Sequence, residues 1–325
     1  MRWLKAVAVL LVLRVVGCTA CAASDDAEDR YAYVLAQLRS ESPGTGVLSG
    51  EWYLVSLSMA GLAAENLGHH ADLAWLTRRA LEPDVRRFDT KLWRSDALET
   101  LATDEGHVGY LGHLGLLLAL DCSDARAADR HRVLSALERR YAAAPDGLIA
   151  TYPNQKWIPD NAVSLAAVAI GARCDGRDVP AREWLQRWPR DAPTGLLQFV
   201  PGRGPRASGA GWNGIYLPYV DAAFARAQFD AAQKTFGFSL LGLEAWREFP
   251  SGVEGHGDVD SGPLVFGLSP AGTGFAIASA SRWAPATRAG MLRTAEVAGM
   301  TVGSHYVVAP LVGEAAVLAA KTMRP

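Results

Sequence analysis

Concentrated basic charge and long apolar runs beyond the N-terminus are both scarce in this 325-residue sequence. Its 32 Lys and Arg residues are balanced by 34 Asp and Glu residues, and they form no basic cluster. Because phosphate contacts need a concentrated basic patch, the composition argues against nucleic acid as a partner. After the N-terminal segment, no run of about 20 apolar residues could form another membrane span.

Motifs for cofactors and for several catalytic mechanisms are also missing. The sequence has no G-x-S-x-G, phosphate-binding loop or dinucleotide fingerprint, and no zinc motif. HGDVD at 256–260 contains groups that bind hard cations, but nothing in it fixes a coordination set. We therefore expect neither a cofactor nor a metal.

The first 23 residues have the pattern of an export signal. MRWLKAVAVLLVLRVVGCTACAA starts with basic residues, continues with an apolar run and ends in small residues. VVGC resembles the lipoprotein processing box. Processing there would make Cys18 the lipidated first residue and anchor the protein in a membrane. The alternative is ordinary signal-peptide cleavage after ACA or CAA. The expectation is an envelope lipoprotein in the periplasm, or a secreted protein, with residues 24–325 as one domain.

An internal repeat with a period of roughly 50 residues dominates the rest of the chain. Each copy has an apolar helix, a short polar turn and an amphipathic helix, and strand-type alternation is nearly absent, so the fold class is all-α. A helix that is apolar all round is buried, whereas an amphipathic helix faces water on one side. The five copies are 61–82, 112–140, 162–188, 214–236 and 262–295.

Two further segments, 25–40 and 304–323, would supply a sixth outer and a sixth inner helix. The repeat then predicts an (α/α)6 toroid closed by the two ends of the chain. The connections from outer to inner helices are long, at 84–106, 143–160, 187–211 and 237–261. Because long loops in compact domains are usually functional, the site is expected at the N-termini of the inner helices.

Two cysteines beyond the signal occupy matching points of the second and third repeats. Cys122 and Cys174 each follow an inner helix, at the end opposite the long loops. In an oxidising compartment they can form a disulfide. The alternative is two separate small apolar residues.

Acids, amides and aromatic residues collect where four inner helices are expected to begin. Two aspartates, Asp258 and Asp260, end one long loop, where Asp260 or Ser261 could also serve as a helix N-cap. A further acid, Asp160, could likewise cap its helix, whereas His113 lies inside an apolar helix. Carboxylates and a histidine can supply acid–base catalysis, so the candidate catalytic residues are His113, Asp160, Asp258 and Asp260. The candidate substrate-binding residues are Tyr110, Tyr152, Trp157, Asn161, Trp212 and Tyr216.

Four segments in order resemble the linalool dehydratase/isomerase family, an (α/α)6 family. They are GYLGHLGLLLAL, YPNQKWIPDNAVSLA, GWNGIYLPYVDAAFARAQFDAAQKTF and REFPSGVEGHGDVDSGPLVFG, and the resemblance spans about Gly50 to Ala280. The resemblance implies that His113 takes part at the site. Thr151 and Asp160 stand where the family has its catalytic cysteines, and Ser208 stands at its tyrosine. It therefore implies the fold and the pocket, but a substrate other than linalool.

Three functional hypotheses follow. The first is an exported lyase, isomerase or hydrolase for a small molecule, terpenoid or sugar-like, with His113 and Asp160 as a proton-transfer pair. The second is a non-catalytic envelope lipoprotein that binds a ligand or a partner. The third, a carboxylate-based glycan-processing toroid, rests on fold-level analogy.

Overall fold

The computed structural model describes residues 26–323. The expected signal segment 1–23, with Cys18, lies outside the described residues. Within that range the chain is mostly helical, and its two sheets each have two short strands. The all-α prediction is confirmed.

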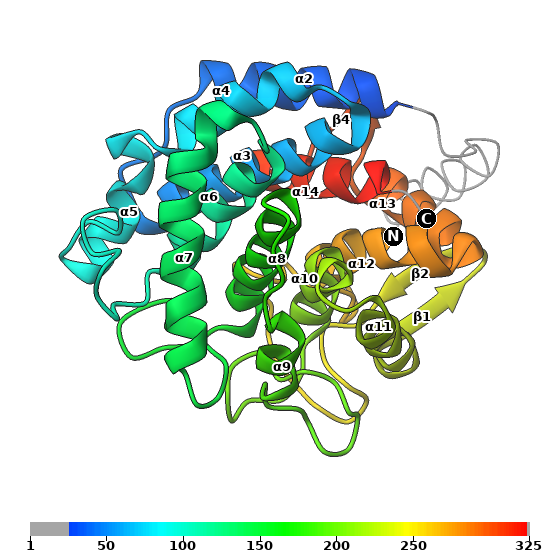
Figure 1. Ribbon diagram of the computed structural model, residues 1–325. Helices are drawn as coiled ribbons and strands as arrows, with labels where there is room; N and C mark the ends of the chain where they lie inside the picture. The colour runs from blue at the N-terminus through cyan, green and yellow to red at the C-terminus, as the bar shows by residue number, and fades with distance from the viewer. Residues whose placement is uncertain (1–25, 324–325) are drawn as a thin grey trace.

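One set of helices packs in sequence around the centre of the molecule (Figure 1). They are α3 (Val47–Leu67), α6 (Val108–Leu120), α8 (Ile158–Cys174), α10 (Ala207–Tyr216), α12 (Pro270–Trp283) and α14 (Leu311–Thr322). Each packs against the next in this order, and α14 packs against α3. All 13 residues of α6 are buried, as expected for a helix that is apolar on every side.

The remaining helices lie outside this set. They are α2 (Ala27–Ser40), α4 (His70–Ala80), α5 (Pro83–Trp93), α7 (Ala127–Ala143), α9 (Ala181–Gln186), α11 (Ala222–Phe236) and α13 (Pro285–Ala298), with 3-10 turns at Asp124–Arg126 and Leu217–Tyr219. Along α7, Val133, Leu134 and Leu137 are buried, while its other side is more exposed. Such helices cover the inner set with one apolar face.

The first and last helices of the described range are joined by two ion pairs, one buried and one partly buried. Arg30 of α2 is fully buried and places Nη1 2.9 Å from a carboxylate oxygen of Glu314 in α14. Lys321 of α14 lies 3.0 Å from Asp26, the residue before α2. These pairs hold α2 against α14.

Several boundaries differ from those expected. The first inner helix begins at Val47 rather than near residue 61, and the expected loop 84–106 contains most of α5. The loop 237–261 begins with a hairpin of β1 (Gly237–Leu240) and β2 (Leu243–Trp246), whose turn residues Leu241 and Gly242 both have positive φ. A second hairpin, β3 (Thr301–Val302) with β4 (His305–Tyr306), precedes α14.

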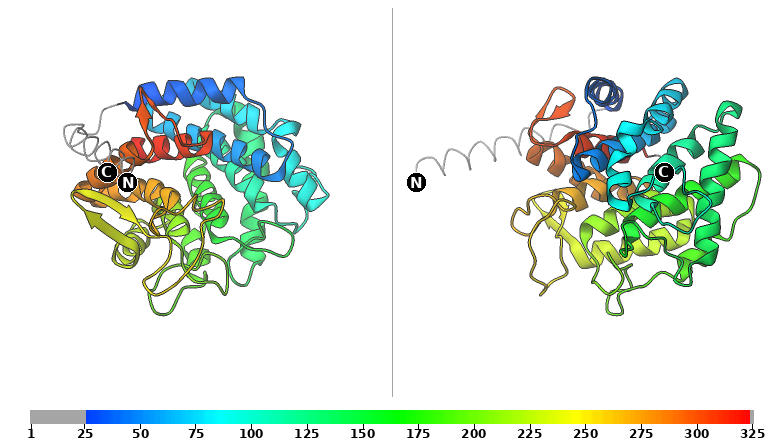
Figure 2. Two further views of the ribbon diagram at one scale, coloured as in Figure 1. Left: turned by 180° about the vertical axis from the view of Figure 1, so that it is seen from behind. Right: turned by 90° about the vertical axis from the view of Figure 1, so that its left-hand side faces the viewer.

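The fifth inner helix begins later than expected. Ser269, not Asp260 or Ser261, caps α12 by accepting a 3.0 Å hydrogen bond from the Gly272 amide. Asp160 is not a cap either, because α8 begins at Ile158 after Trp157. Figure 2 shows the segment between β2 and α12, yellow to gold, as an extended loop on the side that faces away in Figure 1.

Cys122 and Cys174 form a disulfide, with their Cα atoms 6.0 Å apart. The bridge links the residues that follow α6 and end α8, at the opposite end of these helices from the long loops. Within residues 26–323, only α3 is long and apolar enough to cross a membrane. Most of it is buried in the protein, as a core helix would be.

Candidate functional site

A cavity of about 540 Å³ opens at the N-terminal ends of the inner helices. Val47, Leu48 and Glu51 reach it from the first turns of α3, Asp160 from α8, and Ser208 from α10, while Asp260 comes from the loop before α12. This is the end of the molecule that the long connections predicted. Its size is that of a small-molecule site.

Aromatic side chains make up much of the cavity wall: Trp52, Tyr152, Trp157, Phe199, Trp212 and Phe275. Trp157 and Phe199 meet edge to face with ring centroids 5.1 Å apart, as do Trp212 and Phe275. Edge-to-face pairs fix one another in place. Three expected binding residues, Tyr152, Trp157 and Trp212, therefore do line one pocket.

Glu51 is held in the cavity by the Tyr152 hydroxyl, which donates a 2.6 Å hydrogen bond to its Oε1. Burial, followed by the nearby charge of Asp260, raises the pKa of Glu51 to about 7 even though the Tyr152 bond opposes the rise. Burial also raises the pKa of the Tyr152 phenol, so that group stays protonated. Glu51 can therefore exchange protons near neutral pH.

Asp160 lines the same cavity from the first turn of α8. Burial raises the pKa of its carboxyl well above the usual range, and the charges of Glu51 and Asp260 raise it further, against the effect of a hydrogen bond with Thr151. Burial therefore favours the protonated form of this carboxyl, which can donate a proton. Thr151 is buried behind it.

The two aspartates of HGDVD have different positions. Asp260 lines the cavity, and burial together with the charge of Asp258 raises the pKa of Asp260 to about 6. Asp258 does not line the cavity, which corrects the expectation that it acts there. It forms two hydrogen bonds with Arg206, of 2.6 and 2.8 Å. This pairing keeps the pKa of Asp258 below its usual value despite partial burial.

Arg206 connects three parts of the site. In addition to its two hydrogen bonds with Asp258, Arg206 donates a 2.6 Å hydrogen bond from Nε to Glu248, whose side chain is fully buried. Glu248 in turn accepts a 2.6 Å bond from the Ser208 hydroxyl at the cavity wall. Asp258 Oδ1 accepts the backbone N–H of Asp260 over 3.1 Å, so Arg206 fixes the loop that carries Asp260.

His113 does not line the cavity, which corrects the expected pairing with Asp160. It is buried, its Nδ1 shares a 2.6 Å hydrogen bond with the Ser58 hydroxyl, and its ring lies against Trp212, with centroids 5.9 Å apart. Burial lowers the pKa of His113 to about 3. It is a neutral core residue behind the Trp212 wall.

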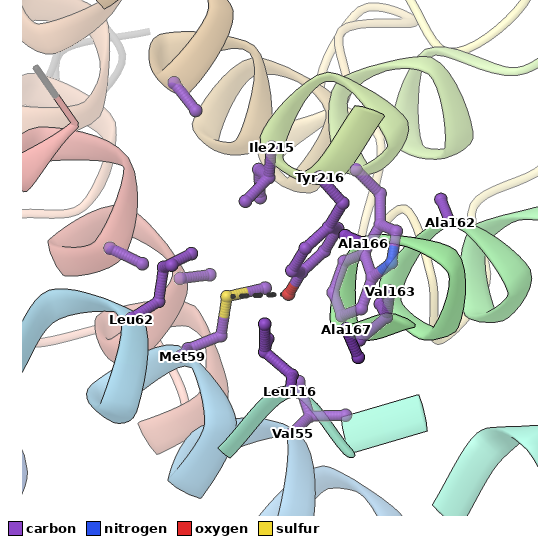
Figure 3. Close-up of a cluster of buried hydrophobic side chains, with 14 of the residues drawn as sticks. Val55, Met59, Leu62, Leu116, Ala162, Val163, Ala166, Ala167, Ile215 and Tyr216 are labelled. Carbon is purple, nitrogen blue, oxygen red and sulfur yellow. Dashed lines mark hydrogen bonds between the residues drawn. The ribbon is translucent and has the colours of Figure 1, made fainter. Parts of the chain in front are cut away.

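Three expected substrate-binding residues are also in the core rather than at the cavity. The hydroxyl of Tyr110 donates to the backbone oxygen of Ala80. The amide of Asn161 bonds the backbone at Ile149 in both directions. The hydroxyl of Tyr216 points to Met59 Sδ, 3.3 Å away, within the apolar cluster from α3, α6, α8 and α10 drawn in Figure 3.

Sequence reasoning missed Glu51, Ser208 as a wall residue, and the buried Glu248. For Glu51 the signal was present, because it lies in the first turns of an inner helix, as Asp160 does. The repeat pattern begins its first copy at residue 61, so Glu51 falls outside the expected inner helix. For Glu248 there was no signal in the sequence, since its burial depends on Arg206, 42 residues earlier.

Comparison of the sequence with protein-family models and with curated proteins gave no match. The assignment of function therefore depends on the site itself.

Proposed function

We propose that this protein is an exported acid–base enzyme of the lyase or isomerase kind, acting on a small, largely apolar molecule with a hydroxyl group or a double bond. The observation that carries the proposal is one aromatic cavity lined by two partly buried carboxyl groups, Glu51 and Asp160. Two carboxyl groups that differ in protonation can act as acid and base in one site.

In the proposed dehydration, neutral Asp160 gives its proton to the substrate hydroxyl. The C–O bond breaks, its electron pair leaves with the oxygen as water, and Glu51 takes a proton from the neighbouring carbon. The electron pair of that C–H bond forms the double bond. The reverse sequence hydrates an alkene, and protonation with loss of a different proton moves a double bond.

The fold proposed for this chemistry is the (α/α)6 toroid. Its support is the packing order of the six inner helices, in which α14 returns to α3, and the outer helices that cover them. The likeness to the linalool dehydratase/isomerase family stands as part of the same proposal. Thr151, Asp160 and Ser208 stand at three active-site positions of that family, and two of them, Asp160 and Ser208, line the cavity.

The alternative of a non-catalytic binding protein is favoured by the burial of His113, which removes the expected histidine from the site. Glycan processing predicts a different substrate for the same carboxyl groups. The products of turnover distinguish glycan processing from the proposal, and the absence of turnover distinguishes the binding protein.

The test incubates the purified protein in deuterated water with a panel of small allylic and tertiary alcohols, small alkenes and oligosaccharides. Mass spectrometry would detect deuterium on carbon, loss of water or new reducing ends. We expect deuterium incorporation or dehydration of one panel member by wild type, abolished in Asp160→Asn and Glu51→Gln and kept in Asp178→Asn, an exposed site. New reducing ends would favour glycan processing, and binding without any turnover would favour the binding protein.

A further inference from the structure

The proposed reaction uses Glu51 and Asp160 but not the third carboxyl group of the cavity, that of Asp260. Asp260 lines the cavity with Glu51 and Asp160, yet dehydration or isomerisation needs only one proton donor and one acceptor. Its backbone N–H is bound by Asp258, and within residues 26–323 its carboxylate has no hydrogen-bond or ion-pair partner. A partly buried carboxylate without a protein partner is available to pair with a cation that enters the cavity.

The nearby positive charge, the guanidinium of Arg206, is already hydrogen-bonded to other carboxylates. The guanidinium of Arg206 lowers the pKa of Asp260, but it makes short hydrogen bonds to both Glu248 and Asp258. One cation therefore faces three carboxylates. In the part of the chain that the structure describes, no Lys, Arg or His lines the cavity.

A metal ion does not fit this arrangement. Metals need several ligands around one point, and among residues 26–323 no three His, Cys, Asp or Glu side chains are placed to share an ion. The lining is instead aromatic around the carboxyl groups, with Leu48 and Val259 about half exposed at the cavity. Aromatic faces attract organic cations, and apolar side chains accept the hydrocarbon attached to them.

We propose that the cavity takes an organic ammonium compound with an apolar body, whose charged nitrogen pairs with Asp260 while its hydrocarbon part lies against the aromatic walls. This names the substrate class of the proposed enzyme and so rests on the proposed function, although the binding itself needs no catalysis. Asp260 would then hold the substrate, with Glu51 and Asp160 left to move protons.

The experiment compares two probes of the same shape, cyclohexylmethylamine and cyclohexylmethanol, by isothermal titration calorimetry with the purified protein. At pH 7.5 the amine should bind at least about tenfold more tightly than the alcohol, a difference of roughly 1.4 kcal/mol. Asp260→Asn should remove most of this preference. The matched control Asp178→Asn, which removes the same charge from an exposed site, should keep it.

The wild-type protein provides a second measurement that does not depend on a variant folding. The amine stays protonated throughout pH 5 to 8, whereas Asp260 gains its proton below about 6. The preference for the amine should therefore shrink as the pH falls from 8 to 5. Because Glu51 in the same cavity has a pKa of about 7, the series is repeated with Glu51→Gln, and the decrease that remains reports Asp260. Equal affinity for the two probes, no binding of the amine, or a preference that is unchanged in both Asp260→Asn and the pH series overturns the proposal.

The two proposals can fail separately. Deuterium incorporation without a preference for the amine would remove the ammonium class and leave the acid–base enzyme standing. A preference for the amine that depends on Asp260, without turnover of any panel member or of amines carrying a hydroxyl group, would leave a cation-binding protein.

Discussion

The Tyr152 hydroxyl and the Glu51 carboxylate, 101 residues apart in the sequence, share a 2.6 Å hydrogen bond across the cavity. This bond links the first turns of α3 to the loop before α8 and fixes the direction in which Glu51 points. Because it favours the ionised carboxylate, it counteracts part of the rise in the pKa of Glu51.

Because the pKa of Glu51 is raised, its ionised carboxylate destabilises the folded protein above neutral pH. The Glu51 carboxyl binds its proton more tightly in the folded state than in the unfolded state. This tighter proton binding stabilises the folded protein at low pH, and the stabilisation is lost as the pH rises from about 4.5 through 7. Glu51→Gln should raise the free energy of unfolding at pH 8 by on the order of 1–3 kcal/mol and change it little at pH 4. Urea unfolding at the two pH values measures this. The exposed control Glu183→Gln should show no such pH dependence, and a Glu51→Gln protein less stable than wild type at pH 8 would contradict the prediction.

Asp160 and Asp258 should respond differently to the same substitution. Asp160→Asn removes the proposed acid, so turnover should fall by about 100-fold or more. Asp258→Asn keeps the cavity lining and weakens the hold on the Asp260 loop, so its main effect should be on substrate affinity. Steady-state kinetics on the substrate found in the panel separates kcat from KM. Equal losses of kcat in the two variants would count against the distinct positions described here.

Removing Arg206 should be strongly destabilising because it leaves the buried Glu248 without its cation. Arg206→Gln should lower the free energy of unfolding by about 3–5 kcal/mol, and adding Glu248→Gln should restore part of it. The exposed pair of Arg226 and Asp230, 3.9 Å apart, provides the control, since Arg226→Gln should cost less than about 1 kcal/mol. A double variant with simply additive losses would show that the two residues do not interact.

The disulfide should stabilise the end of the molecule away from the cavity. Its two cysteines are 52 residues apart, and crosslinks of this span contribute about 2–4 kcal/mol. Replacing both Cys122 and Cys174 with Ser should lower the Tm, and reduction should add two mass units to the intact wild-type protein. An unchanged Tm in the double variant would contradict this expectation.

Cys18 remains a prediction, because it lies outside the described residues. Lipidation predicts that wild-type protein sediments with membranes and that Cys18→Ala does not. Mass spectrometry of the mature N-terminus gives the independent measurement. An N-terminus beyond Cys21 without lipid would support ordinary cleavage instead.

The helical class and the end of the molecule that carries the cavity could be predicted from the sequence, whereas the pairing of Cys122 with Cys174 stayed one of two alternatives until the structure showed it. The first two depend on periodicity and on loop lengths, which are local properties. Trp157 and Asp160 could be placed at the site because they lie at the start of an inner helix, and Asp260 because it lies in the long loop before one.

The misplaced residues depend on how side chains pack, which the sequence pattern does not record. Tyr216 and Trp212 share the short helix α10, yet Trp212 borders the cavity and Tyr216 reaches Met59 in the core. Likewise Asp258 and Asp260 are two residues apart, and only the position of Arg206 decides which one pairs with a cation. Helical spacing identifies a face, but not how deep each side chain on it is buried.

The joint pairing of Arg206 with Glu248 and Asp258 limits how this protein can change over evolutionary time. A lineage that loses the arginine first passes through an intermediate with an uncompensated buried acid, and selection for folding removes it. Loss of Asp258 first is tolerated more easily, because Glu248 keeps its partner. We therefore expect substitutions to begin at the exposed Asp258, which lets the loop that carries Asp260 vary while the pair of Arg206 and Glu248 is kept.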